Sequence, residues 1–481
     1  MRMNELSQQE PEPGLLVEWR PTTRTEVAVQ QRAEHPAPAS PIQESHLRRE
    51  VANDAAGVAH SSWLGTSFEL PGRIDPDAMA AAWRQWVRRH GTMLTWFEPD
   101  ADGELRRYAI AGDDVEFAPV ELGEHTGPEI REHLLNRFDD AAKALHWPPF
   151  VLGAVLRAES STVYFAVDHG HTDGYSMVLV FDELRRLYEQ EITGVDPGLP
   201  EVGDHAEFAA RERAAEIPER SLTAAVELWS DFWLSGGKKP AGFPLSLGLA
   251  DGEAATSRLT EYELFDPRQA NVFGRRCREH GGGFAAGLFV ALAIASAELA
   301  GEETYRTLTP VHTRDEPRWA AAHGWFINLV PIHFELTGSR TFGEVLLQAE
   351  QAFARARGIA DVPMIKLMQH LGSRLSLDGI EQTVLPMTSF MDGRRIRGHE
   401  DWQRADAQVL GGPREETDVM LWVNRAREWT CLLVSHPDTQ VAAENVGRYS
   451  ERVRSVLHRV VEHGDHELRR EHARPEPASP G

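Results

Sequence analysis

Cysteine is scarce in this chain, which has only Cys277 and Cys431 among its 481 residues. Two cysteines exclude a disulfide framework and a zinc cluster built from thiolates. The N-terminal segment MRMNELSQQEPEPG lacks the apolar core of a secretory signal peptide. The longest apolar run, residues 284–299, is shorter than a membrane-spanning helix requires and is expected to be a buried core helix. We therefore expect a cytoplasmic protein without a membrane span.

Basic residues are few relative to acidic ones, with 50 Lys and Arg against 74 Asp and Glu and a formal net charge of −24. Nucleic acids and anionic membranes require basic surfaces, so neither is the expected main partner. The hydrophobic share of 41% is ordinary for a globular protein. Because 481 residues exceed what one core usually supports, we predict two halves, residues 1–205 and 206–481.

Predicted strands and helices alternate along both halves, which indicates an α/β (α+β) fold. The expected strands are residues 63–70, 109–120, 151–156, 162–167, 257–264, 305–311, 329–334, 384–390, 419–423 and 430–435. The expected helices begin at residue 42 and after Asp75-Pro76, and cover 128–144, 175–188, 267–280, 283–300, 341–357, 361–371 and 441–463. The polar, proline-containing ends, residues 1–13 and 466–481, are predicted to be frayed. Residues 20–41 and 195–220 are predicted to be irregular connections, and residues 15–19 an edge strand.

The segment DHGHTDG, residues 168–174, follows the buried strand predicted at residues 162–167. A histidine at a strand end can present one ring nitrogen to a cleft, and its near-neutral pKa suits it to accept a proton from an alcohol or amine. His169 is therefore a candidate general base. Asp173 is placed to fix the loop, by pairing with an arginine or by capping backbone amides. Gly174 is expected to permit a tight turn into the following helix.

Two other interpretations fit the same residues. Short His, Asp and Gly clusters often only build turns, in which case His169 and His171 are loop residues and Asp173 is a helix cap. The pattern of His169, His171 and Asp173 also resembles the metal-binding motif of metallo-β-lactamase-fold hydrolases, and these residue types are reasonable zinc ligands. That motif normally ends in a further histidine, where this chain has Gly174. We therefore expect no metal and no cofactor.

Residues 169–174 resemble the His-x-x-x-Asp-Gly hallmark of the superfamily that contains chloramphenicol acetyltransferase, peptide-synthetase condensation domains and polyketide-associated (Pap) acyltransferases. The hallmark usually begins with two histidines, and Asp168 stands in the place of the first. Other segments of the chain also resemble the superfamily and occur in its expected order: RH to WF (89–97), TR (313–314), GWFINLVP (324–331), TSFMD (388–392) and LWVNR (421–425). The last two, with residues 13–19, look most like the trehalose-esterifying branch of the Pap acyltransferases. Leu94 departs from the pattern, because many condensation domains carry there an arginine that pairs with the motif aspartate.

The resemblance implies roles for several residues. His169 would be catalytic, and Arg314 is a candidate partner for Asp173. Ser389 is a candidate donor to the oxyanion, and Asn328 a candidate tunnel-lining residue. The apolar neighbours of Asn328 are expected mainly in the core: Trp325, Phe326, Leu329 and Val330. Two residues of the LWVNR segment are expected to pack or pair structurally: Trp422 and Arg425.

The resemblance also implies a fold and a reaction. The fold would be two chloramphenicol-acetyltransferase-like sandwich halves in a V, with an active-site tunnel between them. The reaction would move an acyl group from a thioester, either acyl-CoA or a carrier protein, to a hydroxyl of a sugar, polyol or natural-product alcohol. A free-standing condensation enzyme that forms an amide is an alternative, as is a non-catalytic recruitment module on the same fold. The intact His169 argues against the module.

Overall fold

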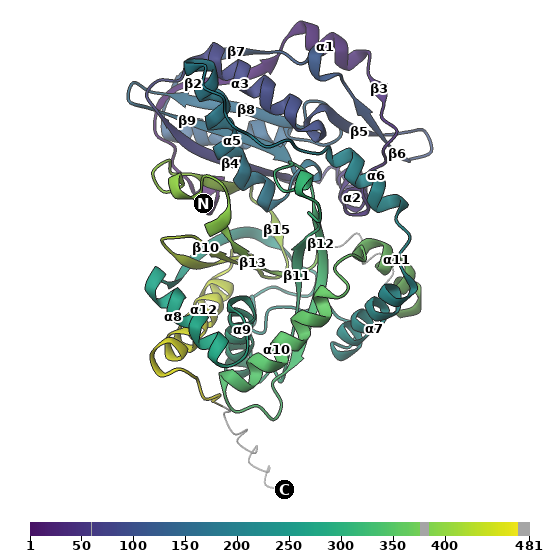
Figure 1. The fold of residues 1–481 in the computed structure, drawn as a ribbon, viewed down its shortest axis with the longest axis vertical. Coiled ribbons are helices and arrows are strands. Elements are labelled where there is room, and N and C mark those ends of the chain that lie inside the picture. Colours follow the sequence, from purple (N-terminus) through teal and green to yellow (C-terminus); the bar gives the residue numbers. More distant parts are fainter. Residues whose placement is uncertain (59, 376–383, 470–481) are drawn as a thin grey trace.

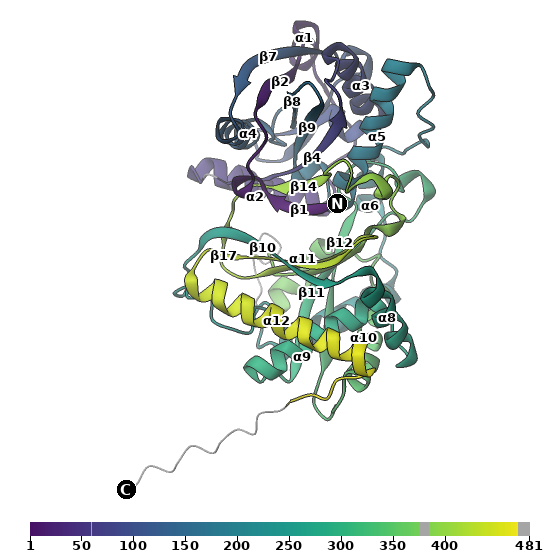
Figure 2. The ribbon, with the colours of Figure 1, turned by 90° about the vertical axis from the view of Figure 1, so that its left-hand side faces the viewer.

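The computed structural model describes residues 1–58, 60–375 and 384–469. Helices and strands alternate throughout these residues, which confirms the predicted mixed fold class. Figure 1 shows the elements from the first part of the chain, in purple and blue, above those from the later part, in teal, green and yellow. The N-terminus lies at the boundary between the two groups (Figure 2).

Among the described residues, the largest sheet has seven strands in the order β1-β14-β4-β9-β8-β2-β7. Their bounds are β1 Arg2–Glu5, β2 Gly14–Pro21, β4 Trp63–Pro71, β7 Phe117–His125, β8 Phe150–Leu156, β9 Ser160–Asp168 and β14 Gln408–Gly411. Successive side chains of a strand point to opposite faces, so this sheet has two apolar faces. Helices α3 (Pro76–Arg89) and α5 (Gly174–Thr193) pack against one face, and α4 (Gly127–Ala141) packs against the other. The central strand β9 therefore carries the histidine motif out of a packed core.

The later part of the chain forms a five-stranded sheet, β13-β16-β17-β10-β15, and a separate β11-β12 pair. The strands are β10 Ala255–Phe265, β11 Thr304–His312, β12 Ile327–Glu335, β13 Thr388–Asp392, β15 Glu415–Glu416, β16 Met420–Arg425 and β17 Thr430–Pro437. The helices around them are α7 Glu219–Ser235, α8 Pro267–Glu279, α9 Phe284–Ala300, α10 Phe342–Arg357, α11 Met364–Leu375 and α12 Gln440–His463. α9 is buried along most of its length, as predicted for residues 284–299.

The remaining helices and strands of the described residues include a small three-stranded sheet, β3-β6-β5. They are helices α1 Thr23–Gln30, α2 Pro41–Ala56 and α6 His205–Ala214, and strands β3 Ala33–Glu34, β5 Thr95–Pro99 and β6 Leu105–Ala109. α2 begins with a reciprocal capping box between Ser40 and Gln43, with Pro41 at its first position. The Gln43 side chain also donates to the backbone carbonyl of Gly170 at 2.7 Å. The start of α2 is thereby attached to the motif loop.

Several predictions for the first part of the chain are wrong. Residues 1–13 are not frayed, because β1 pairs in parallel with β14 and the N-terminal residue is buried. Residues 15–19 are not an edge strand, since β2 lies between β8 and β7. Residues 20–41 contain α1 and β3. The single strand predicted at residues 109–120 is divided between β6 and β7, because a turn at Gly112–Asp114 separates them.

Predictions for the later part need similar corrections. Residues 195–220 contain α6 and the beginning of α7. The strand predicted at residues 384–390 is displaced to β13. Residues 466–469 are not frayed, because two of them hydrogen-bond to Glu298. The other residues of that predicted tail, 470–481, lie outside the described residues.

No single helix in the described part of the chain is long and apolar enough to cross a membrane, although α8 and α9 pass that test together as a pair bent by 91°. Cys277 and Cys431 are both free and buried. The predicted boundary between residues 205 and 206 coincides with the first residue of α6. That division and a cytoplasmic location stay predictions.

Candidate active site

The motif segment lies where the central strand β9 ends and α5 begins. β9 ends at Asp168, His169–His171 form one turn of 3₁₀ helix, and α5 begins at Gly174. The turn is closed by Asp168, whose Oδ1 accepts a hydrogen bond from the backbone amide of Gly170 at 2.7 Å. The predicted order of strand, loop and helix around the motif is therefore confirmed.

His169 is half-buried, and its ring nitrogen Nδ1 is covered and has no hydrogen-bond partner on another described residue. Burial, followed by the charge of His46, lowers the pKa of His169 to about 4. The imidazole is therefore neutral at pH 7, because a pKa below the ambient pH favours the unprotonated form. A neutral imidazole is the form that can accept a proton.

The ring of Trp325 lies against His169, with ring centroids 4.2 Å apart and an interplanar angle of 41°. The same indole contacts His46 edge-on at 5.5 Å. Trp325 is half-buried, so the prediction that it belongs mainly to the core is wrong, whereas Phe326 and Val330 are buried as predicted. In the extended chain that leads into β12, successive side chains face opposite sides, which turns Trp325 away from the core that Phe326 enters.

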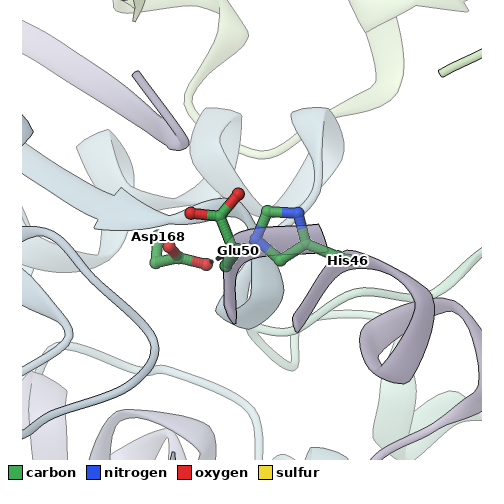
Figure 3. Close-up of side chains that lie close together, drawn as sticks. All are labelled: His46, Glu50 and Asp168. Atoms are coloured by element: carbon green, nitrogen blue, oxygen red, sulfur yellow. Dashed lines mark hydrogen bonds and ion pairs between the residues drawn. The ribbon is translucent and has the colours of Figure 1, made fainter. Parts of the chain in front are cut away.

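Asp168, which stands where the resemblance places a first histidine, binds an imidazole from another element. Its Oδ1 lies 2.8 Å from Nε2 of His46 on α2 (Figure 3). Its Oδ2 accepts a hydrogen bond from the hydroxyl of Ser62 at 2.9 Å. Burial alone would raise the pKa of Asp168, but the charge of His46 and the hydrogen bonds from His46 and Gly170 hold it well below its ordinary value. The rings of His46 and His169 are 6.2 Å apart between centroids.

Of the residues that the structure describes, one group has potential metal-ligand atoms within 4.8 Å of one another: His46, Glu50 and Asp168 (Figure 3). These atoms already have protein partners, because His46 binds Asp168 and His60 Nε2 lies 2.6 Å from Glu50. The cluster therefore consists of two hydrogen-bonded pairs, His46 with Asp168 and Glu50 with His60. The residues of the zinc interpretation do not form such a group: His169, His171 and Asp173.

His171 is buried and anchors the motif loop. Its Nδ1 lies 3.0 Å from the backbone carbonyl of Thr92, in a 3₁₀ turn that precedes β5, and its ring contacts Phe97. Burial lowers the pKa of His171 to about 4. His171 therefore has the structural role that the turn-building interpretation gives it.

Asp173 is enclosed by donors from three segments. Its Oδ1 accepts from the backbone amide of Ser176 at 2.6 Å, which caps α5, and its Oδ2 accepts from the amide of Phe326 at 2.9 Å. Arg314 Nη2 lies 3.3 and 3.2 Å from the two oxygens. The candidate partner Arg314 thus contacts Asp173, and it supplies the positive charge that Leu94 cannot.

Arg314 connects the motif to the chain between β11 and β12. Its Nη1 donates to the backbone carbonyls of Trp319 and Ala322 at 2.7 and 2.6 Å. Its guanidinium lies 4.2 Å from the ring centroid of Phe326 and 4.9 Å from that of Tyr175. The guanidinium therefore contacts two aromatic rings as well as two backbone carbonyls, so its orientation toward the motif is determined by packing as well as by charge.

The two glycines near the motif, Gly174 and Gly324, differ in whether the surrounding structure has room for a side chain. Gly174 does not have a left-handed φ, and a Cβ built there would meet no heavy atom within 4 Å. The expected tight turn is therefore not the reason for a glycine at this position. Because glycine has no side chain, space remains open beside the first turn of α5. At Gly324, in contrast, a Cβ would lie 2.5 Å from the ring of His205.

The remaining candidates lie on β12 and β13. Asn328 fixes the segment before α11, because its Nδ2 donates to the carbonyls of Ala360 and Val362 at 3.0 and 2.7 Å and its Oδ1 accepts from the amide of Met364 at 2.9 Å. Ser389 is half-buried, and no described residue hydrogen-bonds to its hydroxyl. Its role as an oxyanion donor stays a prediction.

Sequence analysis does not identify His46 as part of the site. His46 lies on the buried face of α2, which also carries Gln43, Leu47 and Glu50 at helical spacing. A helix face that buries glutamine, histidine and glutamate together with one leucine must provide partners for them, because an unpaired buried polar group is costly. That composition is the signal that would have indicated a polar site beneath α2.

Comparison with known proteins agrees with this arrangement. The family of condensation domains matches residues 33–477 of the chain. Acyltransferase PapA3 of Mycobacterium tuberculosis is 28% identical over 460 residues, which cover 94% of this chain and 95% of that protein. The 2'-acyl-2-O-sulfo-trehalose (hydroxy)phthioceranyltransferase PapA1 of Mycobacterium bovis is 30% identical over 461 residues, which cover 95% of this chain and 88% of that protein. A solved structure of a PapA2 acyl transferase has a TM-score of 0.86 and 26% identity, and the match covers 96% of this chain and 100% of that chain. This chain therefore belongs to the condensation-domain family, and it is an acyltransferase.

Proposed function

We propose that this enzyme transfers an acyl group from a thioester, either acyl-CoA or a carrier protein, to a hydroxyl of a sugar, polyol or natural-product alcohol, with His169 as general base. The observation that carries the proposal is the neutral, half-buried imidazole at the end of the central strand, in contact with Trp325. One relative supports a sugar acceptor, because PapA1 is named for a sulfated trehalose derivative.

In the proposed mechanism, His169 accepts the hydroxyl proton while the hydroxyl oxygen attacks the thioester carbonyl carbon. Nδ1 is covered by protein, so Nε2 is the nitrogen that takes this proton. The tetrahedral oxyanion is stabilised by hydrogen-bond donors, for which Ser389 is the candidate, because its hydroxyl has no hydrogen-bond partner among the described residues. The C–S bond then breaks, and the departing sulfur takes the proton from the imidazolium. The products are an ester and a free thiol, and His169 returns to its neutral form.

We also propose that residues 1–205 and 206–481 form the two halves of the enzyme, in a V with the reaction site in a tunnel between them. The contact of Asp173 with Arg314 supports this arrangement, since one residue comes from each half. Trp325 adds a second such contact, because it reaches across to His169.

The test is the variant His169→Gln, which removes the proton acceptor and retains a polar side chain of similar size. We expect acyl transfer from a purified thioester donor to fall by about 10²–10⁴-fold, with the thermal unfolding midpoint unchanged. His312→Gln is the matched control, because His312 is an exposed histidine at the end of β11. In the unaltered enzyme, kcat/KM should stay level from neutrality down toward pH 4, since His169 is protonated only near its pKa of about 4. Turnover by His169→Gln at the rate of the control would refute the general-base role.

The acceptor is tested separately. Matched alcohol and amine acceptors are offered with one thioester donor, and the products are identified by mass spectrometry. A hydroxyl oxygen needs a base during attack more than a neutral amine does, so we expect the ester. Exclusive formation of the amide would favour the free-standing condensation enzyme and refute the proposed acceptor.

A further inference from the structure

A cavity of about 520 Å³ lies beside the first turns of α8, between the β16–β17 hairpin and the 3₁₀ turn Gly393–Arg395 that follows β13. Figure 1 shows α8 and β13 in the lower, later part of the chain. The volume is within the range of small-molecule sites, about 300–1,000 Å³. Its polar and aromatic lining includes Asn271, Arg394, Arg425, Arg427, Glu428 and Trp429. In the described structure, none of these residues hydrogen-bonds to the histidine motif.

Arg425 is the buried cation of this cavity, with 8% of its surface exposed. Its Nη2 donates to the neutral amide oxygen of Asn271 at 3.3 Å, and its guanidinium lies 4.0 Å from the ring centroid of Phe284. Within the described residues, it has no carboxylate at ion-pair distance. Burying this charge is unfavourable, because burial, followed by the nearby charge of Arg394, lowers the pKa of Arg425, and the attraction of Asp392 offsets only part of that effect. A negatively charged ligand would relieve this cost.

The other charges around the cavity leave a positive surplus. Arg394 forms an ion pair with Asp392, and in-register pairing of β13 with β16 places Asp392 opposite Arg425. Arg427 and Glu428 are both exposed, and within the described residues neither forms an ion pair. Three guanidinium groups therefore face two carboxylates, in a chain whose net charge is −24. The TSFMD and LWVNR segments meet here, since Asp392 ends one and Arg425 ends the other.

We propose that this cavity is a binding site for a small molecule that carries a phosphate or sulfate monoester. A guanidinium presents parallel N–H donors that match the oxygens of a tetrahedral oxyanion, and it keeps its charge in a buried site better than other cations do. Trp429 is half-buried and forms an apolar wall for the uncharged part of such a molecule. The cavity has the volume of a small-molecule site, which favours a metabolite over the surface of a macromolecule.

The experiment is isothermal titration calorimetry on the full chain. Two probes distinguish the sources of the anionic group: adenosine 3′,5′-bisphosphate carries phosphate monoesters, and glucose 6-sulfate carries a sulfate monoester. Adenosine and glucose are the uncharged controls. We expect at least one charged probe to bind, with an affinity that falls as salt is raised.

Two variants locate the binding. Arg425→Gln should weaken it by about tenfold or more, because a lost charged hydrogen bond of 1.5–3 kcal/mol corresponds to that factor. Arg427→Gln, at an exposed position, should weaken it by a smaller factor and leave folding unchanged. Arg404→Gln is the matched control, because Arg404 is 78% exposed and does not line the cavity.

The outcomes are decisive in both directions. Binding of one probe alone would identify the anionic group and support the site. Absence of binding by both probes, or equal binding by the unaltered chain and Arg427→Gln, would overturn it, even where Arg425→Gln failed to fold. Binding is measured without turnover, so the result is independent of the general-base test on His169.

Discussion

Replacing Asp173 by asparagine removes one negative charge from a position that is 1% exposed, with almost no change of shape. Arg314, whose side chain is 5% exposed, would then remain buried without its carboxylate partner. Removing one member of a buried ion pair costs about 3–5 kcal/mol. Asparagine could still accept from the Ser176 amide, but its own amide group would face Arg314 and the backbone amide of Phe326, which are both donors. We therefore expect Asp173→Asn to lose about 3–5 kcal/mol of unfolding free energy, together with acyl transfer.

The assay is urea unfolding and acyl transfer on the same preparation. Asp75→Asn is the control, since Asp75 also caps a helix but is exposed and makes no ion pair with a described arginine, so its loss should be below about 1 kcal/mol. A double-mutant cycle with Arg314→Gln should show strong coupling between the two positions. An Asp173→Asn protein as stable as the control variant, inactive and with an altered pH–rate profile, would show that Asp173 acts in the chemistry. That result would refute the structural role argued here.

Two further predictions concern stability. Gly324→Ala should lower the unfolding free energy by about 1–3 kcal/mol, because its Cβ would lie 2.5 Å from the His205 ring. Gly174→Ala is the control and should leave the urea midpoint unchanged. Equal effects of the two substitutions would contradict the packing argument. Unfolding free energy should also fall as the pH is lowered from about 6.5 to 4, because unfolded His171 takes up a proton near pH 6.5 and folded His171 only near 4, a difference of about 3 kcal/mol. His171→Gln should show a shallower pH dependence, and an identical one would contradict this account.

The elements that carry the motif could be predicted because their signals are local. β9 contains the apolar run at residues 163–167, and α5 follows directly after the aspartate that caps it. β1 and β14 have no such signal, since each has only four residues and each exists through pairing with strands far away in the chain. The prediction that residues 1–13 and 466–469 are frayed is wrong for the same reason, because distant partners fix their polar residues.

The residues of the site also differ in whether a local pattern in the sequence indicates them. His169 and Asp173 follow from a motif that is contiguous in the sequence, and Arg314 follows from a second segment that the resemblance aligned with it. His46 could not be found by either route, because it is 122 residues away from Asp168, its polar partner, and Asp168 is where the resemblance expects a histidine. The prediction that Trp325 belongs to the core is wrong because it treats the whole apolar segment as buried. In an extended segment, successive side chains alternate between its two sides.

The site contains a second imidazole, that of His46, although Asp168 stands in the place of the first histidine of the hallmark. The Asp168 carboxylate holds the His46 ring at 2.8 Å, and the His46 ring lies 6.2 Å from His169 and 5.5 Å from Trp325. An imidazole that the resemblance expects next to the base in sequence is instead brought there through space by α2, and its charge contributes to keeping His169 neutral. Burial is the larger cause of the low pKa of His169, and the position of α2 adds to it through His46. Gln43 at the start of α2 also donates to the carbonyl of Gly170, so α2 is attached to the motif loop at two points, through Gln43 and through His46.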